Sequence, residues 1–197
     1  MAKSSNKALW ITLAVIAFVV LIIILTIWGA YNRFVTLDQN VEGKWSEVEN
    51  QYQRQSDLIP NLVSVTASSI SVETKFVKDV IAQRTAWQNA QSTVDKDKAG
   101  LQMNSGIAAF VNAVAESYPT LQANKQYVAL TDELSGTQNR IANSRREYIN
   151  AVQSFNTAIK RFPGNMIAGM YGFEAKEYYQ ASGDLTTPQI GTGQLPQ

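Results

Sequence analysis

The feature that most restricts the fold of this chain is an uninterrupted apolar stretch from Ala8 to Ala30. It contains no charged residue, and Thr12 and Thr26 are its only polar side chains apart from two tryptophan indoles. A helix of this length rises roughly 34 Å, slightly more than the ~30 Å hydrocarbon core of a bilayer. Apolar residues cover every face, so a buried core helix is a poorer explanation. We therefore predict a transmembrane helix over residues 8–30, after a short N-terminal segment of residues 1–7.

Aromatic residues lie at both ends of the apolar stretch. Trp10 and Trp28 flank it and Tyr31 follows directly, and such rings favour the interface between lipid and water. A cleaved signal peptide is the alternative, but its apolar core would be shorter, and Trp28-Gly29-Ala30 is a poor cleavage site. We expect the three aromatic residues to lie at the membrane interface.

The basic residues around the stretch bear on its orientation. Lys3, Lys7 and the amino terminus precede it, whereas Arg33 and Lys44 follow it together with acidic residues. Positive charge is enriched on the cytoplasmic side of membrane spans, and acidic residues count little in that rule. The bias favours a cytoplasmic N-terminus, which makes the chain a single-pass protein of the cell membrane with its domain outside the cytoplasm.

Past the apolar stretch, large apolar residues recur at intervals of seven. One pair of rows consists of Phe34, Val41 and Val48, with Trp45, Tyr52 and Ile59 as companions. The longest row comprises Leu134, Ile141, Tyr148, Phe155 and Phe162. This spacing is typical of coiled-coil-like helices that pack at about 20° to one another. Long helices joined by short loops run antiparallel, so we predict an all-α, antiparallel four-helix bundle over residues 31–175.

Prolines, glycines and charge runs indicate where the helices end. Asp57 and Pro60 are typical of the first turn of a new helix, although Pro60 could instead kink one continuous helix. The alternating charges of residues 93–98 indicate a solvated loop, and Pro119 ends the third helix.

The end of the chain has its own signals. Pro163 and Gly164 end the fourth helix, and residues 165–173 are expected to form a short apolar turn of helix. Residues 176–197 are expected to be a flexible polar tail, because they lack the apolar side chains that offset the entropy of ordering.

The composition excludes several classes of functional site. The chain has no His and no Cys, so disulfides, thiol nucleophiles, Ser-His-Asp triads and zinc sites with His or Cys ligands are ruled out. Lys plus Arg number 17 against 16 for Asp plus Glu, which gives no overall charge for binding nucleic acid. We expect no catalytic residue, no metal and no cofactor; an enzyme that uses only carboxylates and Lys is the poorer alternative.

Four polar residues form a candidate cluster for a partner or for helix register. Arg54 and Asp57 lie three residues apart at the predicted helix junction, Asn61 lies one turn further, and Arg145 occupies a position of the fourth helix that should be apolar. Either the cluster binds a ligand or partner, or Arg145 forms a buried ion pair with Asp57 or Glu116. Setting helix register is the best-attested use of such buried charge.

Two further features have a functional and a structural interpretation. The basic residues Lys160 and Arg161 either bind anionic lipid head groups or belong to a solvated helix face. Gly136 lies inside the longest predicted helix, where glycine costs about 1 kcal/mol relative to alanine. A close approach of two helices, a hinge or a partner contact would each explain it.

Several short motifs follow one another in a familiar order along the chain. They include Trp45-Ser46-Glu47-Val48, Asp57-Leu58-Ile59-Pro60-Asn61-Leu62-Val63, Tyr118-Pro119, Leu134-Ser135-Gly136-Thr137-Gln138-Asn139-Arg140-Ile141-Ala142 and Phe162-Pro163. Over about residues 31–173 the chain resembles the LemA family of bacterial and archaeal membrane proteins. The resemblance implies a membrane helix before an antiparallel helical bundle. Some members are linked to membrane protein quality control or to membrane-organelle formation, which loosely implies scaffolding.

These observations favour a membrane-anchored, non-enzymatic interaction or scaffolding module. The alternative is a sensor or accessory subunit of a membrane protein complex, such as a quality-control protease. The expected partners are the lipid bilayer, a second copy of the chain in a homo-oligomer, or an unidentified membrane or envelope protein; nucleic acid is not expected.

Overall fold

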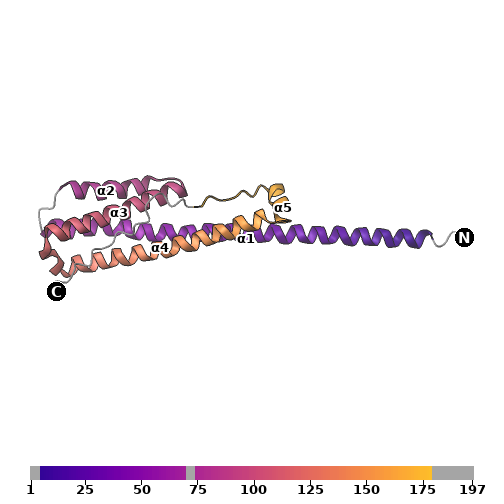
Figure 1. Cartoon of the computed structure of the whole chain (residues 1–197), viewed down its shortest axis with the longest axis horizontal. Helices are drawn as coiled ribbons and strands as arrows, with labels where there is room; N and C mark the ends of the chain where they lie inside the picture. The colour runs from indigo at the N-terminus through magenta and orange to yellow at the C-terminus, as the bar shows by residue number, and fades with distance from the viewer. Residues whose placement is uncertain (1–4, 70–73, 179–197) are drawn as a thin grey trace, which may run out of the picture. The chain divides into compact units, whose positions relative to one another are not determined.

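The computed structural model describes residues 5–69 and 74–178, and most of this part is helical (Figure 1). Its elements are α1 (Ser5–Ser69), α2 (Thr74–Asn89), α3 (Thr93–Ser117), the 3-10 helix η1 (Pro119–Ala123), α4 (Lys125–Lys160) and α5 (Gly164–Tyr171). The described residues contain no β-strand, which confirms the all-α prediction.

Contacts along the backbone group the helices into two compact units. Unit 1 contains α1 as far as Gly43, α4 from Asn150 onward, α5 and the segment after it to Tyr178. Unit 2 contains residues 44–149, that is, the rest of α1 and α4 together with α2, α3 and η1. α1 and α4 therefore each contribute to both units.

Unit 1 begins with the apolar stretch as the N-terminal part of α1. Its large apolar side chains are exposed from Leu9 to Leu25. α1 is the one helix in the described part of the chain that is long and apolar enough to cross a membrane. Further along, Phe34 of α1 and Phe155 of α4 are buried, and both rings contact Phe173, which follows α5. α1 thus changes from exposure on all sides to burial on one face within this unit.

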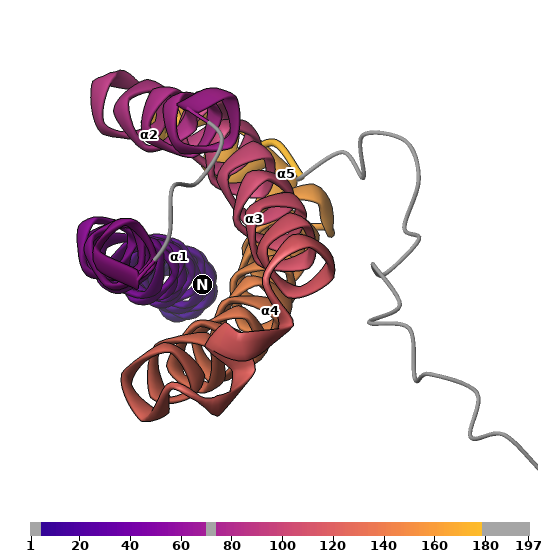
Figure 2. The same cartoon turned by 90° about the vertical axis from the view of Figure 1, so that its left-hand side faces the viewer.

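Unit 2 is a bundle of four helical segments that alternate in direction along the chain (Figure 1). The view along the helices shows α2, α3 and α4 in an arc beside α1, with α3 between α2 and α4 (Figure 2). The predicted heptad rows fill the interior, with Val48, Tyr52, Ile59, Leu134 and Ile141 all buried. α2 and α3 add Val80, Trp87, Met103, Ile107, Phe110 and Val114. Burial of these apolar side chains is the main force that holds the segments together.

The predicted helix boundary at Asp57 and Pro60 is wrong, because α1 continues through Pro60 to Ser69. A proline within a helix has no N–H to donate, so the carbonyl four residues earlier, that of Ser56, loses its usual partner. Nε of Arg84 in α2 donates to this carbonyl at 3.0 Å. The alternative of one continuous helix is therefore correct, and the neighbouring helix supplies the missing hydrogen bond.

The predicted loop at residues 93–98 is also wrong, because these residues form the first turns of α3. Ser92 caps the helix: its Oγ accepts from the backbone N–H of Asp95 at 3.0 Å and donates to Oδ2 of Asp95 at 2.7 Å. Successive helical positions face different sides, which separates the alternating charges. Lys96 pairs with Glu49 of α1, whereas Asp97 is buried.

The end of α4 agrees with the prediction except at one residue. The helix ends at Lys160, shortly before Pro163. Phe162 lies beyond this end and is 80% exposed, so its expected place in the buried heptad row is wrong.

The expected short apolar helix is present as α5. A Cβ at Gly164 would lie 2.5 Å from the carbonyl oxygen of Ala158, so only glycine lets the start of α5 approach the end of α4 this closely. After α5, the side-chain amide of Asn156 donates to the carbonyl of Lys176 and accepts from its N–H. Residues 179–197 of the predicted tail lie outside the described residues.

Candidate functional site

A buried carboxylate, Asp97, is the centre of a polar cluster in unit 2. It comes from the first turns of α3 and is 4% exposed. The hydroxyl of Tyr52 in α1 donates to its Oδ1 at 3.2 Å, and Nη2 of Arg145 in α4 donates to its Oδ2 at 2.9 Å. Three helices therefore meet through one carboxylate, and both of its oxygens accept a hydrogen bond.

Burial dominates the electrostatics of this cluster. It raises the pKa of Asp97 above the ordinary value of 3.8, and the charge of Arg145 and the hydrogen bond from Tyr52 oppose this effect only in part. Burial also raises the pKa of Tyr52, and the charge of Asp97 raises it further. The Tyr52 hydroxyl therefore keeps its proton at neutral pH and can donate it to the carboxylate in a hydrogen bond.

Gly100 allows α3 to pack closely against this cluster. A Cβ at this position would lie 2.5 Å from Cζ of Tyr52, so any side chain would displace the ring. The ring of Tyr52 also contacts that of Trp87 in α2, with centroids 6.3 Å apart. The cluster is thus enclosed by residues of all four helical segments, which is consistent with the predicted role in helix register; that role stays a prediction.

A second polar network lies at the surface of unit 2. Arg54 of α1 binds Oε1 of Glu133 in α4 through Nε at 2.9 Å and Nη2 at 2.8 Å. Arg140, two turns along α4, donates to the same oxygen at 2.7 Å. Among the described residues, no three His, Cys, Asp or Glu side chains gather into a group that could hold a metal ion.

The predicted cluster of Arg54, Asp57, Asn61 and Arg145 is distributed over different places. The ion pair that Arg145 forms is with Asp97, which corrects the expected choice of Asp57 or Glu116. Asp57 is exposed and accepts a hydrogen bond from the neighbouring Gln53 at 2.8 Å.

Asn61 is exposed and lines a shallow groove between α1 and α4 of unit 2. The groove has a volume of about 400 Å³ and is lined by Asn61, Ser64, Val65, Gln126, Ala129 and Leu130.

The neighbours of Gly136 in α4 do not explain why this position is a glycine. The nearest atoms to a Cβ there belong to Arg140 of the same helix, at 3.6 Å or more. A close approach of two helices therefore does not account for it, and a hinge or partner contact stays a prediction.

Sequence reasoning missed Asp97 because it assigned residues 93–98 to a loop. The signal that would have found it is the pair Ser92 and Asp95, whose spacing of three is typical of a capping box. A helix that starts at Thr93 places one face inward, which consists of Asp97, Gly100, Met103, Ile107, Phe110 and Val114. A charged residue on that face must have a partner.

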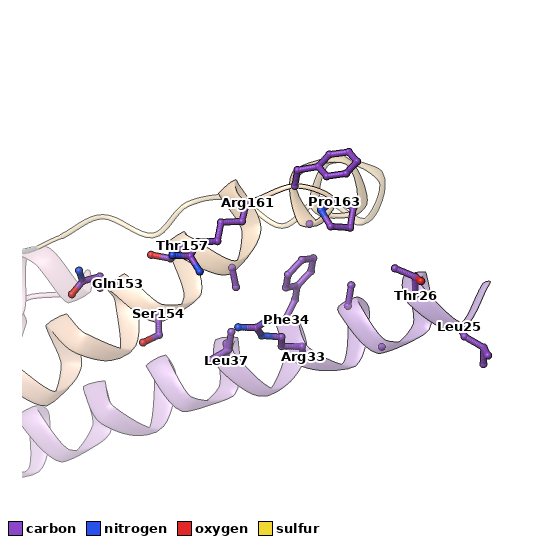
Figure 3. Close-up of a pocket in the computed structure, with 15 residues that line it drawn as sticks. Leu25, Thr26, Arg33, Phe34, Leu37, Gln153, Ser154, Thr157, Arg161 and Pro163 are labelled. Carbon is purple, nitrogen blue, oxygen red and sulfur yellow. The ribbon is translucent and has the colours of Figure 1, made fainter. Parts of the chain in front are cut away.

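Unit 1 contains an open cleft of about 680 Å³ between α1 and the end of α4 (Figure 3). The wall from α1 consists of Leu25, Thr26, Gly29, Ala30, Arg33, Phe34 and Leu37. The opposite wall consists of Gln153, Ser154, Thr157, Ala158, Arg161, Phe162, Pro163 and Gly164. We call this space the arginine cleft, because Arg33 and Arg161 are its charged lining residues.

The charge of the arginine cleft is entirely positive. No Asp or Glu is among its lining residues. Figure 3 shows the side chain of Arg33 on α1 and that of Arg161 at the end of α4 lying along the same space. Neither arginine forms an ion pair with another of the described residues. The sequence prediction named Arg161 among its basic residues but did not connect it with Arg33.

The three residues predicted at the membrane interface also belong to unit 1. Trp10 and Trp28 are 70% and 63% exposed on the apolar part of α1. Tyr31 instead packs against the aromatic residues after α4, with its ring centroid 4.9 Å from that of Tyr171 and 5.9 Å from that of Phe173. Their location in a membrane interface stays a prediction.

Comparison with known proteins adds a family context to this arrangement. A model of the LemA family matches residues 44–191. Magnetosome protein MamQ 2 of Paramagnetospirillum magneticum is 29% identical over 93% of this chain and 76% of its own length. MamQ of Magnetospirillum gryphiswaldense is 26% identical, again over 93% of this chain and 76% of its own length. Protein LemA of Metamycoplasma hominis is 26% identical over 90% of this chain and 84% of its own. Together with the exposed apolar part of α1, these matches indicate a membrane-associated helical protein.

Proposed function

Because the chain belongs to the LemA family, we propose that it is a non-enzymatic, membrane-anchored protein that acts as an interaction or scaffolding module at the membrane. The continuity of α1 carries this proposal. The exposed apolar stretch and the bundle-forming part are one helix from Ser5 to Ser69. A helix that is apolar all round at one end and buried on one face at the other can hold a bundle to a bilayer without a linker.

Unit 1 supports the anchoring part of the proposal. The ring of Tyr31 packs on Tyr171, and Phe34 is buried, so packed structure begins within about one helical turn after Ala30. Were the apolar stretch in a bilayer, the folded part of unit 1 would start at its surface. Such a short connection suits a protein that presents a fixed surface to membrane partners.

The polar residues of unit 2 support the non-enzymatic part. A general acid or base must reach its substrate within hydrogen-bond distance. Asp97, the buried carboxylate of the bundle, already accepts hydrogen bonds from Tyr52 and Arg145. His and Cys, the residues that most often supply acid–base and nucleophilic chemistry, do not occur in the sequence.

An accessory subunit of a membrane protein complex, such as a quality-control protease, is the second candidate. The predicted polar cluster does not support it, because Arg54 and Arg145 belong to different networks. The observation that favours it is the groove beside Asn61, whose mixed lining of three polar and three apolar residues suits a protein segment. The names of the relatives do not choose between the candidates, since two are named for the magnetosome and one for the family alone.

Single-cysteine variants test the interaction role, because the natural chain has no Cys. Ser64→Cys places a thiol in the groove, and Gln88→Cys provides an exposed control on α2. In native membranes, a photo-cross-linker on Ser64→Cys should give a discrete adduct that the control lacks. A doubled mass identifies a second copy, and another mass identifies a different partner. No adduct at either position, together with a monomer in mild detergent, contradicts the interaction role.

Two fractionation experiments test the anchor and its orientation. The full-length chain should stay in the membrane pellet after an alkaline carbonate wash and dissolve only with detergent. In intact spheroplasts, a membrane-impermeant maleimide should label Gln88→Cys but not Lys3→Cys if the domain lies outside the cytoplasm. The reverse labelling would correct the orientation, whereas recovery in the carbonate supernatant would refute the anchor itself.

A further inference from the structure

We propose that the arginine cleft binds the phosphate head group of an anionic phospholipid between Arg33 and Arg161. This inference rests on the proposed function, because it requires the apolar part of α1 to lie in a bilayer. It adds a ligand site to what is otherwise an anchor and a bundle.

The charge of the cleft favours an anion. The lining contributes two guanidinium groups and no carboxylate, so the space carries an uncompensated positive charge. A cleft lined by one sign of charge concentrates ions of the other sign. Guanidinium groups match the geometry of phosphate oxygens and can donate two hydrogen bonds to them. A head group with its own cation, such as choline, gains less because that cation meets two arginines.

The remaining polar atoms of the cleft are consistent with this ligand. The hydroxyls of Thr26 and Ser154 already donate to carbonyls one turn back in their own helices, at 2.8 Å each. Gln153 and Thr157 also line the cleft. Within the described part of the chain, neither side chain forms a hydrogen bond. The two arginines, Gln153 and Thr157 can therefore donate to a phosphate or to the hydroxyls of its head group.

The cleft joins apolar and charged surface along one helix, as a phospholipid requires. Leu25 belongs to the exposed apolar stretch, and Arg33 lies about two turns further along the same helix, roughly 12 Å away at the rise of an α-helix. An acyl chain can follow the apolar side chains while the phosphate reaches the arginine. Gly29 and Ala30 lie between them, and these small residues leave room for a ligand on this side of the cleft. Nothing lies within 4 Å of a Cβ at Gly29.

An apolar stripe beside the cleft provides an independent indication of lipid. Met166 and Met170 lie four residues apart on α5 and are 64% and 70% exposed, and Phe162, which lines the cleft in the turn before α5, is 80% exposed. The two methionines therefore share one face of α5. Exposed apolar residues next to basic ones are typical of segments that lie in the membrane interface. A small water-soluble anion would not account for this stripe.

Binding of short-chain lipids to the purified full-length chain in a neutral detergent tests the proposal. The probes are dihexanoyl phosphatidylglycerol, dihexanoyl phosphatidylcholine and inorganic phosphate, each measured by calorimetry. We expect phosphatidylglycerol to bind at least about tenfold more tightly than the other two, as one extra charge-assisted hydrogen bond would give. The double variant Arg33→Gln and Arg161→Gln should lose this preference.

Arg146→Gln is the matched control, because Arg146 is an exposed arginine of α4 that belongs to unit 2. It should bind phosphatidylglycerol like the natural chain, and circular dichroism should show that all variants keep their helices. Equal binding of inorganic phosphate would identify a free anion instead of a lipid and overturn the proposal. Equal binding of phosphatidylcholine, or an unaffected double variant, would overturn it as well.

The outcome is distinguishable from failure of the anchor. If the chain remains in the membrane pellet but shows no preference for phosphatidylglycerol, only the arginine cleft loses its assignment. If the chain leaves the membrane in carbonate, the proposed function fails first and the lipid site with it.

Discussion

The two units of this protein use arginine in different ways. In unit 2, Arg145 forms an ion pair with the buried Asp97, which also accepts a hydrogen bond from Tyr52, so that residues of three helices meet there. In unit 1, Arg33 and Arg161 line an open cleft without an acidic side chain. The same residue type thus has an internal partner in one unit and lines an open cleft in the other.

This difference separates charge that holds the fold from charge that is available to a ligand. Removing one partner of a buried ion pair leaves an uncompensated charge in a medium that solvates it poorly. Removing an exposed arginine has little effect on folding, because water solvates it equally well in both states. Substitutions in unit 2 should therefore change stability, and substitutions in the arginine cleft should change ligand binding.

The largest effect is expected for Arg145→Met. The substitution leaves Asp97 buried without its cation, and at pH 7 it should lower the free energy of unfolding by about 3 kcal/mol. Thermal unfolding in detergent, followed by circular dichroism, measures this loss. The double variant Arg145→Met with Asp97→Asn should recover a large part of it. A double variant as unstable as the single one would show that packing of the arginine, and not its charge, is what matters.

Gly100→Ala should come next, because its new Cβ would lie 2.5 Å from Cζ of Tyr52. Overpacking of a tightly packed core costs about 1–3 kcal/mol. Gly43→Ala is the matched control in α1, where nothing lies within 4 Å of the added Cβ. There the better helix propensity of alanine should raise stability by up to about 1 kcal/mol. Equal effects of the two substitutions would contradict the close packing of α3 on Tyr52.

A hydrogen bond from Arg84 compensates for the N–H that Pro60 lacks in α1. Arg84→Met removes the donor to the Ser56 carbonyl and should cost about 1–2 kcal/mol. Pro60→Ala restores the N–H of the helix itself, so in that background Arg84→Met should cost clearly less. A double-mutant cycle of unfolding free energies measures this coupling. Independent effects of the two substitutions would show that the arginine acts elsewhere.

The predictability of the fold differs between local and nonlocal features. The heptad rows predicted the buried faces of α1 and α4, because burial on one side of a helix has a period that is visible in a short stretch of sequence. Pro60 misled the prediction, since the group that keeps α1 continuous, Arg84, comes from another helix. No local pattern around Pro60 contains that information.

The candidate sites show the same limit. Arg145 was recognised as a charge on an apolar face, but its partner Asp97 required the correct start of α3. The arginine cleft combines Arg33 of α1 with Arg161 at the end of α4, and only the folded chain brings such distant residues together. A sequence pattern can therefore identify an unusual residue, but the residues that contact it in the fold come from distant parts of the chain and are not predicted.

A smaller effect is expected from pH. Because burial raises the pKa of Asp97 above 3.8, the folded state holds the proton more tightly than the unfolded state does. The contribution of Asp97 to stability is therefore greatest below its ordinary pKa and is lost as the pH rises through the raised value. The slope for one proton is at most about 1.4 kcal/mol per pH unit.

Unfolding curves from pH 4 to 7 test this sign through the difference between the natural chain and Asp97→Asn. The natural chain should lose stability relative to the variant as the pH increases, because the asparagine does not ionise. Other carboxylates contribute equally to both curves and cancel. A difference that grows in favour of the natural chain with pH would mean that Arg145 outweighs burial and that the pKa of Asp97 is lowered.

The smallest effect on stability should come from the arginine cleft, which makes it the sharpest test of the contrast between the units. Arg33 and Arg161 are exposed and form no ion pair with another described residue, so Arg33→Gln and Arg161→Gln should each change the free energy of unfolding by less than about 0.5 kcal/mol in neutral detergent. Added phosphatidylglycerol should raise the unfolding temperature of the natural chain, because a ligand that binds only the folded state stabilises it. The two variants should show a smaller rise. A loss of stability in detergent alone, comparable with that of Arg145→Met, would show that these arginines hold unit 1 together, and the division between structural and available charge would no longer stand.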